Sequence, residues 1–178
     1  MDPSAAGREK AVIHECRYLM RLLANRQRSA GELRQALARR EVPADVAHEV
    51  MARMDRSGLI DDRAFAAEWV RQRRRLRSLS DEALRRELEQ REVAPPAVIL
   101  DAISADEDGP DGEEERCREL VRSRLSPADL ERLQEDRDGS HRRRLSRRLD
   151  ALLTRKGYPG DLAVRVISGE LREAAQEH

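Results

Sequence analysis

A spacing pattern that recurs three times along the chain constrains the fold more than any other feature of the sequence. A leucine is followed by a second leucine after four residues, a basic residue after seven, and valine or tyrosine after nine. The three copies begin at Leu33, Leu84 and Leu149. Leucines four residues apart lie on one face of a helix, and a second stretch of helical apolar spacing follows each copy. Recurrence at this length predicts tandem helical units, each with too little core to stand alone.

A helical pattern also precedes each copy, so three helices are expected per unit. Its apolar markers begin at Tyr18, at Phe65 and at Leu120, and in the second unit they extend to Leu76. Phe65 and Trp69 lie four apart on the packing face and are interpreted as core. The predicted domain boundaries are a disordered tail at 1–10, a first repeat at 11–58, a second repeat at 59–104, an acidic linker at 105–115, and a third repeat with a C-terminal tail at 116–178.

The run GLIDDRAF at 58–65 combines a helix stop with a helix start. Gly58 suits the left-handed residue that ends many helices, and Leu59 is expected to pack back on the helix that it follows. Asp61 is expected to cap the next helix, with Ile60 and Phe65 as a hydrophobic staple. Asp61 and Asp62 could resemble a catalytic carboxylate pair, but capping explains Asp61 better than catalysis does.

Two other helix starts carry capping signals. Ser29 and Glu32 form a capping-box pattern, in which each side chain accepts a hydrogen bond from the other residue's backbone N–H. Ser126, Pro127 and Asp129 combine a cap residue, a first-turn proline and an acidic third position. Both patterns predict helices that begin one residue later.

The composition excludes several classes of function. Charged residues make up 39% of the chain and aromatic residues 2%. Enzyme cores normally bury more aromatic surface, and β-sheets need more aromatic and β-branched residues. The phosphate-loop, dinucleotide-binding and HExxH motifs are all missing, and Cys16 and Cys117 are too far apart for a CxxC pair. We therefore expect no catalytic residue, no metal, no cofactor and two buried free cysteines.

The N-terminal residues lack an apolar signal-peptide core, and no run of about 18 apolar residues could span a membrane. The sequence thus predicts a cytoplasmic protein without a membrane partner. The formal net charge is zero, but an acidic stretch at 104–139 separates two mildly basic parts. Global charge therefore gives no nucleic-acid signal, although a basic face could form locally.

Arginine clusters are the candidate contact residues. A planar, bidentate guanidinium suits phosphate or an acidic protein surface. Clusters of this kind also occur as solvated faces near helix C-termini, where the helix dipole favours cations. Both interpretations stay open for the candidates, which are Arg39, Arg40, Arg71, Arg73, Arg74, Arg75, Arg77, Arg85, Arg86, Arg144, Arg147 and Arg148.

Two longer motifs resemble those of the RecX family of regulatory proteins. The run GLIDDRAFAAEWVRQRRRL at 58–76 is similar to the family signature, in which a Gly-Leu-(Leu/Ile)-(Asp/Asn)-Asp junction precedes an arginine-rich helix. The run LSRRLDALLTRKGYPGDLAVRVI at 145–167 is similar to the family's C-terminal element. The resemblance covers about residues 15–168, and the acidic run at 106–115 is longer and more charged than the family pattern.

The resemblance implies an all-α fold of three tandem three-helix units in an elongated, curved molecule. It also implies a non-catalytic regulator that binds the RecA recombinase and its filament on single-stranded DNA. Such a regulator would inhibit ATP hydrolysis, strand exchange and co-protease activity, with roles in recombination, DNA repair and the SOS response. The alternatives are a helical protein that binds single- or double-stranded DNA directly and a scaffold for another protein. A monomer is expected.

Overall fold

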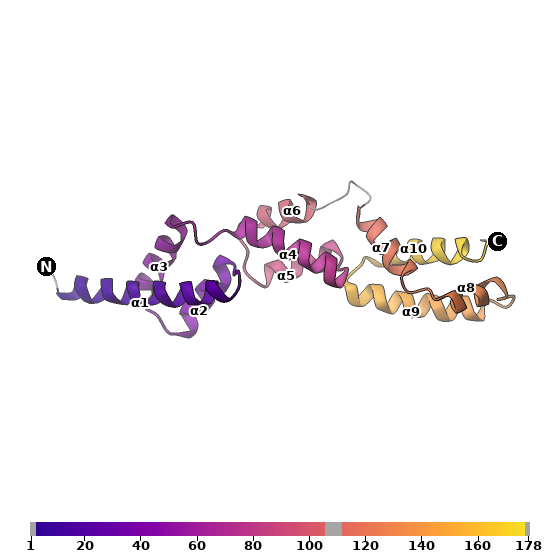
Figure 1. Cartoon of the computed structure of the whole chain (residues 1–178), viewed down its shortest axis with the longest axis horizontal. Coiled ribbons are helices and arrows are strands. Elements are labelled where there is room, and N and C mark those ends of the chain that lie inside the picture. The colour runs from indigo at the N-terminus through magenta and orange to yellow at the C-terminus, as the bar shows by residue number, and fades with distance from the viewer. Residues whose placement is uncertain (1–2, 106–111, 177–178) are drawn as a thin grey trace. The chain divides into compact units, whose positions relative to one another are not determined.

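All the regular structure that the computed structural model describes, in residues 3–105 and 112–176, is α-helix (Figure 1). The predicted all-α class is confirmed. The helices within these residues are α1 (Pro3–Asn25), α2 (Ala30–Arg39), α3 (Ala44–Arg56), α4 (Asp62–Arg77), α5 (Asp81–Glu89), α6 (Pro96–Ala105), α7 (Gly112–Arg122), α8 (Pro127–Gln134), α9 (Ser140–Lys156) and α10 (Gly160–Glu173).

The chain divides into two compact units. The first contains the described residues up to Trp69 together with Glu87–Ala105, and the second contains Val70–Arg86 together with the described residues after 111. The division passes through α4 and α5, so it does not follow the predicted repeat boundaries.

Three segments differ from their predictions. Helix α1 begins at Pro3, where a disordered tail over 1–10 was expected. Of the predicted acidic linker, 106–111 lies outside the described residues, whereas 112–115 forms the first turn of α7, where glutamates favour a helix N-terminus. The third repeat contains four helices where three were expected. Ser126 and Pro127 separate α7 from α8, because Ser126 caps the start of α8 and Pro127 is its first residue.

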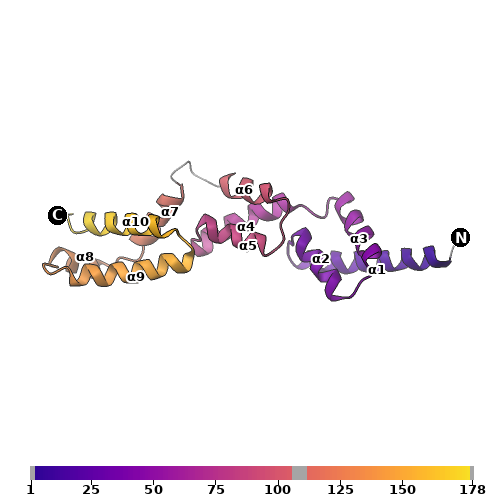
Figure 2. The same cartoon turned by 180° about the vertical axis from the view of Figure 1, so that it is seen from behind.

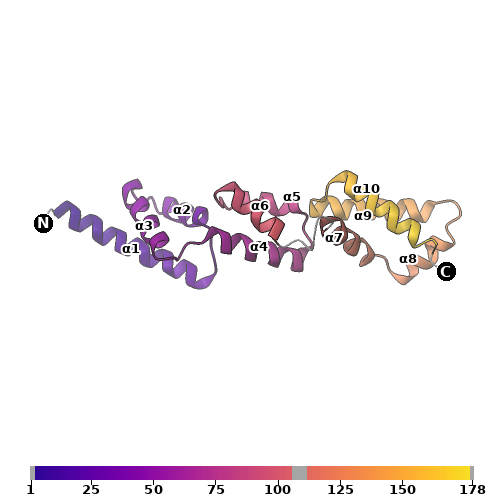
Figure 3. The same cartoon turned by 90° about the horizontal axis from the view of Figure 1, so that it is seen from above.

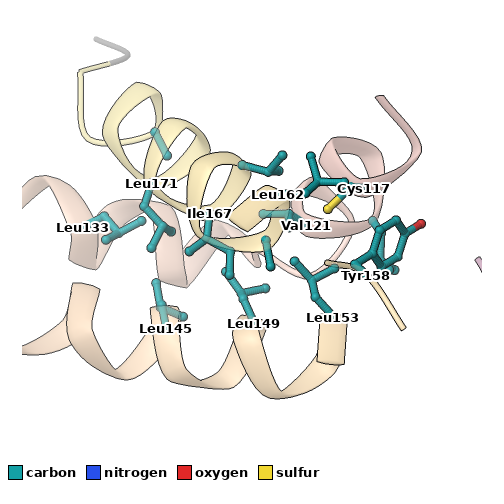
Figure 4. Close-up of a cluster of buried hydrophobic side chains, with 14 residues drawn as sticks. Cys117, Val121, Leu133, Leu145, Leu149, Leu153, Tyr158, Leu162, Ile167 and Leu171 are labelled. Atoms are coloured by element: carbon teal, nitrogen blue, oxygen red, sulfur yellow. The ribbon is translucent and has the colours of Figure 1, made fainter. Parts of the chain in front are cut away.

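The core of the first unit lies where α1 and α2 pack against α3 (Figure 2). Buried leucines at the repeat positions, Leu33 and Leu37, join Leu19 of α1 and Val50 of α3. Because these positions recur at three- and four-residue intervals, each helix directs one apolar face inward. Figure 4 shows the equivalent core of the second unit, where Leu145, Leu149 and Leu153 point from α9 toward α10. Figure 3 shows α9 and α10 side by side.

Local capping chemistry follows the sequence closely. Both Ser29 and Ser126 form the two reciprocal bonds of a capping box. Gly58 has a φ of 65°, and Asp61 Oδ1 accepts a hydrogen bond from the N–H of Ala64 at 2.9 Å. Leu59 takes the expected position just after the helix end, because its N–H donates to the carbonyl of Met54 (3.0 Å), although its side chain is 44% exposed.

The nine-residue spacing of the repeat comes from a shared helix ending. In each copy, the residue nine positions after the first leucine donates its N–H to the carbonyl of the second leucine. The donors are Val42 (3.2 Å), Val93 (3.2 Å) and Tyr158 (3.1 Å). The preceding residue has a positive φ in each copy, at Glu41, Glu92 and Gly157. This is the Schellman motif, which places the following apolar residue back against the helix. Accordingly, Val93 and Tyr158 are buried and Val42 is half-buried.

Two copies place glutamate where the third has glycine. We expect Glu41→Gly to stabilise the protein by about 0.5–1 kcal/mol, because relief of left-handed strain exceeds the entropy that glycine adds to the unfolded chain. Arg34→Gly, at an exposed position inside α2, should instead cost about 1 kcal/mol. Urea denaturation followed by circular dichroism measures both, and a loss of stability in Glu41→Gly would contradict the strain argument.

Candidate functional site

In the first unit, the start of α2 meets the end of α5. The Ser29 side chain, fully buried, donates to the carbonyl of Arg91. Gly31 lies against the turn that follows α5 and contains Arg91 and Glu92. A Cβ at Gly31 would stand 2.6 Å from the Arg91 carbonyl oxygen and 2.2 Å from the Cβ of Glu92. The helix start and the turn are therefore in direct backbone contact, and only glycine permits this approach.

Asp62 bridges this contact from the first residue of α4. Its Oδ1 accepts from the N–H of Ala30 (2.8 Å) and its Oδ2 accepts from the N–H of Ala94 (3.1 Å). One carboxylate thus satisfies an orphan N–H at the start of α2 and fixes the segment that follows α5. The second aspartate of the acidic pair is a structural bridge.

The second unit repeats this contact with other residues. Ser80, also fully buried, donates its N–H to the carbonyl of Lys156 (3.1 Å). A Cβ on Gly157 would lie 2.7 Å from both the Ser80 hydroxyl and the Ala83 Cβ. Glu113 of α7 accepts from the N–H of Asp81 (2.8 Å), as Asp62 does from Ala30.

Sequence reasoning missed this recurring contact, although a signal was present. Ser29 and Ser80 each stand four residues before the first leucine of a copy. Their partners, Arg91 and Lys156, are the basic residues that stand seven positions after the first leucine of the next copy. Aligning the copies would have paired the two serines, whereas the contact between copies depends on long-range packing.

Several candidate arginines are held by partners within the protein. Arg74 has a side chain that is 7% exposed and donates to Asp81 Oδ1 (2.8 Å), which also accepts from Arg116 (2.7 Å). Arg40 forms two bonds to Glu15 (2.9 and 3.0 Å) and lies 4.3 Å from the centre of the Tyr18 ring. These guanidiniums stabilise the units, which weakens their case as contacts.

Trp69 and Phe65 confirm the core interpretation. Their rings stack with centroids 5.8 Å apart, Phe65 is buried and Trp69 is half-buried. The guanidinium of Arg91 covers the Trp69 ring at 3.7 Å, as that of Arg40 covers Tyr18. In two copies, therefore, the basic residue seven positions after the first leucine covers an aromatic ring of the helix that precedes the copy.

Other candidates lie on α4 and α5. Arg85 and Arg86 both pair with Glu82, while Arg71, Arg75 and Arg77 are exposed and Arg73 is half-buried. Leu76 is 63% exposed, so its expected place on the packing face of α4 is wrong. Together with Arg39 of α2, these side chains leave guanidinium groups at the surface of both units.

On α9, Arg144 donates to His141 Nδ1 (2.8 Å) and Arg148 to Asp129 Oδ2 (3.0 Å), while Arg147 is exposed. Burial alone raises the pKa of Asp129, but hydrogen bonds from Arg148 and Ser126 and the charge of Arg148 outweigh it. They lower the pKa to about 2. The carboxylate therefore stays ionised and joins α8 to α9.

This low pKa predicts acid sensitivity. Because the pKa is lower in the folded protein than the ordinary 3.8, Asp129 stabilises the fold above about pH 4 and loses this effect as the pH falls toward 2. We expect Asp129→Asn to lower the free energy of unfolding at pH 7 by about 1–2 kcal/mol. At pH 2 the variant and the parent should be alike. An equal difference in urea denaturation at both pH values would contradict this role.

Both cysteines are free thiols; Cys117 is buried and Cys16 is half-buried. Burial raises the pKa of Cys117 to about 12, so its thiol is protonated and unreactive at neutral pH. Within 3–105 and 112–176, His, Cys, Asp and Glu side chains form no group of three suited to a metal ion. The helices in those ranges are also too short or too polar to cross a bilayer.

Comparison with known proteins gives concordant matches. The family model described as RecX, first three-helix domain, matches residues 17–54, and that of the second three-helix domain matches residues 61–98. The regulatory protein RecX of Mycobacterium tuberculosis is 37% identical over 171 residues, covering 95% of this chain and 91% of the relative. The regulatory protein RecX of Streptomyces coelicolor is 36% identical over 158 residues, covering 89% of this chain and 78% of the relative.

Solved structures support the same fold. The crystal structure of RecX from Lactobacillus salivarius aligns with a TM-score of 0.72 at 18% identity, covering 93% of this chain and 99% of that one. Another crystal structure of regulatory protein RecX gives a TM-score of 0.69 at 19% identity, covering 93% and 75%. Since relatives above 30% identity span nearly the whole sequence, the chain belongs to the RecX family.

Proposed function

We propose that this chain is a non-catalytic regulator that binds the RecA recombinase and its filament on single-stranded DNA. It inhibits ATP hydrolysis, strand exchange and co-protease activity, and it acts as a cytoplasmic monomer. The observation that carries the proposal is 37% identity to a regulatory protein RecX along 95% of the chain. The three predicted repeats, at 11–58, 59–104 and 116–178, serve as the binding modules.

Inhibition requires differential binding. A regulator alters a filament only if it binds one conformation more tightly than another. An array of linked helical units suits this task, because it contacts several subunits at once and favours the arrangement in which all contacts form together. Exposed arginines such as Arg39, Arg75 and Arg147 supply the charge-assisted contacts.

The test is DNA-dependent ATP hydrolysis by the cognate RecA with this chain titrated in below one molecule per RecA. Strong suppression at low ratios is the expected result, and it favours action on the filament over competition for DNA. Undiminished hydrolysis at an equimolar ratio would overturn the proposal.

A second candidate is direct binding to DNA, and the arginines at the surface of α9 favour it. It predicts that bare DNA competes with the filament for this chain. Equal affinity for bare single-stranded DNA and for the filament, with suppression relieved by added DNA, would select this function over the first.

A further inference from the structure

Helix α1 of the first unit has two sides with different surroundings. On one side Val12 and Leu19 are buried in the core that α1 forms with α3. The other side follows intervals of three and four residues, which keep it on one face of the helix, and every residue on it is exposed. This outer face of α1 consists of Lys10, Ile13, Arg17, Met20 and Ala24.

The outer face exposes two large apolar side chains in line. Ile13 is 40% exposed and Met20 is 44% exposed, and they lie seven residues, or about 10 Å, apart. Single exposed apolar residues are ordinary, and the others in the described part of the chain lie one to an element. Those others are Leu59, Leu76, Leu100 and Val164. Two apolar residues seven apart form the pattern by which one helix packs along another.

A basic row runs beside the apolar row. Lys10 and Arg17 are also seven residues apart and precede Ile13 and Met20 by three positions each. The acidic residues of α1 are paired with arginines of other elements. Glu15 is buried against Arg40 at 2.9 Å, and Glu9 pairs with Arg53 of α3 at 2.7 Å. The outer face therefore combines an apolar row with positive charge.

We propose that the outer face of α1 binds an acidic amphipathic helix of a partner protein other than RecA. Apolar side chains seven residues apart on the partner pack against Ile13 and Met20, and carboxylates beside them pair with Lys10 and Arg17. The inference goes beyond the proposed function, because the arginines proposed there as filament contacts lie on α2, α4 and α9.

Charge and apolar area together select this occupant. A symmetric dimer through the outer face would bring two basic rows together, and like charges across an interface weaken it. Binding to a bilayer scales with the apolar area that is inserted, and more than half of the surface of Ile13 and of Met20 is already covered. An acidic helix uses both rows at once.

The test is fluorescence anisotropy of a labelled synthetic peptide titrated with the full chain. The peptide has leucines seven residues apart with glutamates beside them, and a side-chain cross-link holds it helical, because short peptides are marginal helices in water. A second peptide has lysine in place of each glutamate. We expect the parent to bind the glutamate peptide at least about 10-fold more tightly than the lysine peptide.

The apolar row is tested by Ile13→Gln with Met20→Gln. This variant should bind the glutamate peptide at least about 10-fold more weakly, because it lacks both apolar anchors. The matched control is Leu59→Gln with Leu100→Gln, which changes two exposed apolar residues elsewhere in the first unit and should bind as the parent does. Circular dichroism checks that both variants remain helical. Equal losses in the two variants would overturn the proposal.

The basic row is tested by Lys10→Glu with Arg17→Glu. This variant should reverse the preference and bind the lysine peptide at least about 10-fold more tightly than the glutamate peptide. Unfolding cannot produce such a reversal, because an unfolded chain would lose both peptides. Equal binding of the two peptides by the parent, no saturable binding of the glutamate peptide, or an unchanged preference in the variant would each contradict the proposal.

The other occupants have their own signatures in the variant Ile13→Gln with Met20→Gln. Sedimentation that shows a dimer of the parent but not of this variant would assign the outer face to a second copy. Vesicles of phosphatidylserine and phosphatidylcholine that bind the parent but not the variant would assign it to a bilayer. Either result overturns the proposal. Suppression of RecA hydrolysis should be the same in parent and variant, and a loss would assign the outer face to the filament, which overturns a separate partner but leaves the proposed function intact.

Discussion

Gly31→Ala is expected to destabilise the protein by about 2–3 kcal/mol, because the new methyl group would overlap a backbone that cannot move freely. Its Cβ would stand 2.6 Å from the Arg91 carbonyl oxygen and 2.8 Å from that of Glu92. Relief requires the end of α5 to retreat from the start of α2. That movement would strain the bond from Ser29 and both bonds of Asp62. Urea denaturation measures the loss.

Gly7→Ala is the matched control in the same unit. A Cβ at Gly7 meets nothing within 4 Å, and the residue lies within α1. Alanine there should add up to about 1 kcal/mol through helix propensity. The two changes are chemically identical and are expected to act in opposite directions. If Gly31→Ala left the midpoint unchanged, the contact between α2 and α5 would not be part of the folded state in solution.

The sequence predicted local contacts correctly but did not predict contacts between distant residues. The caps at Ser29, Ser126 and Asp61 were predicted correctly, because each depends on residues within three positions. Gly31 and Asp62 act on residues about 30 to 60 positions away. Without contact information the glycine resembled any other, and Asp62 had no predicted role beyond its place beside Asp61 in an acidic pair.

The arginines were predicted less well for a related reason. Periodicity identifies the face of a helix, but it does not say which arginine meets a carboxylate of another helix. Arg74 and Arg75 are neighbours in sequence, yet the first is buried against Asp81 and the second is exposed. The sequence treated them as one cluster, and the structure divides them into a structural residue and a candidate for contact.

Arg74→Glu is therefore expected to cost about 3–5 kcal/mol in unfolding free energy, because it buries a carboxylate beside the carboxylate of Asp81. Arg116 would then be left to pair with two carboxylates, that of Asp81 and that of the introduced glutamate. The loss should lower the urea midpoint and, at 37 °C, reduce helicity. A charge-reversal experiment that includes Arg74 would lose RecA binding through unfolding and would say nothing about contact.

Arg75→Glu with Arg77→Glu separates the two effects. Both side chains are exposed, so the urea midpoint should change by less than about 0.5 kcal/mol, as is usual at the surface. If these arginines face an anionic filament surface, like-charge repulsion should raise the concentration needed for half-maximal suppression of RecA hydrolysis by about 10- to 100-fold. Arg17→Glu with Arg34→Glu, also exposed, should leave suppression unchanged. Equal suppression by both double variants would exclude the end of α4 from the interface.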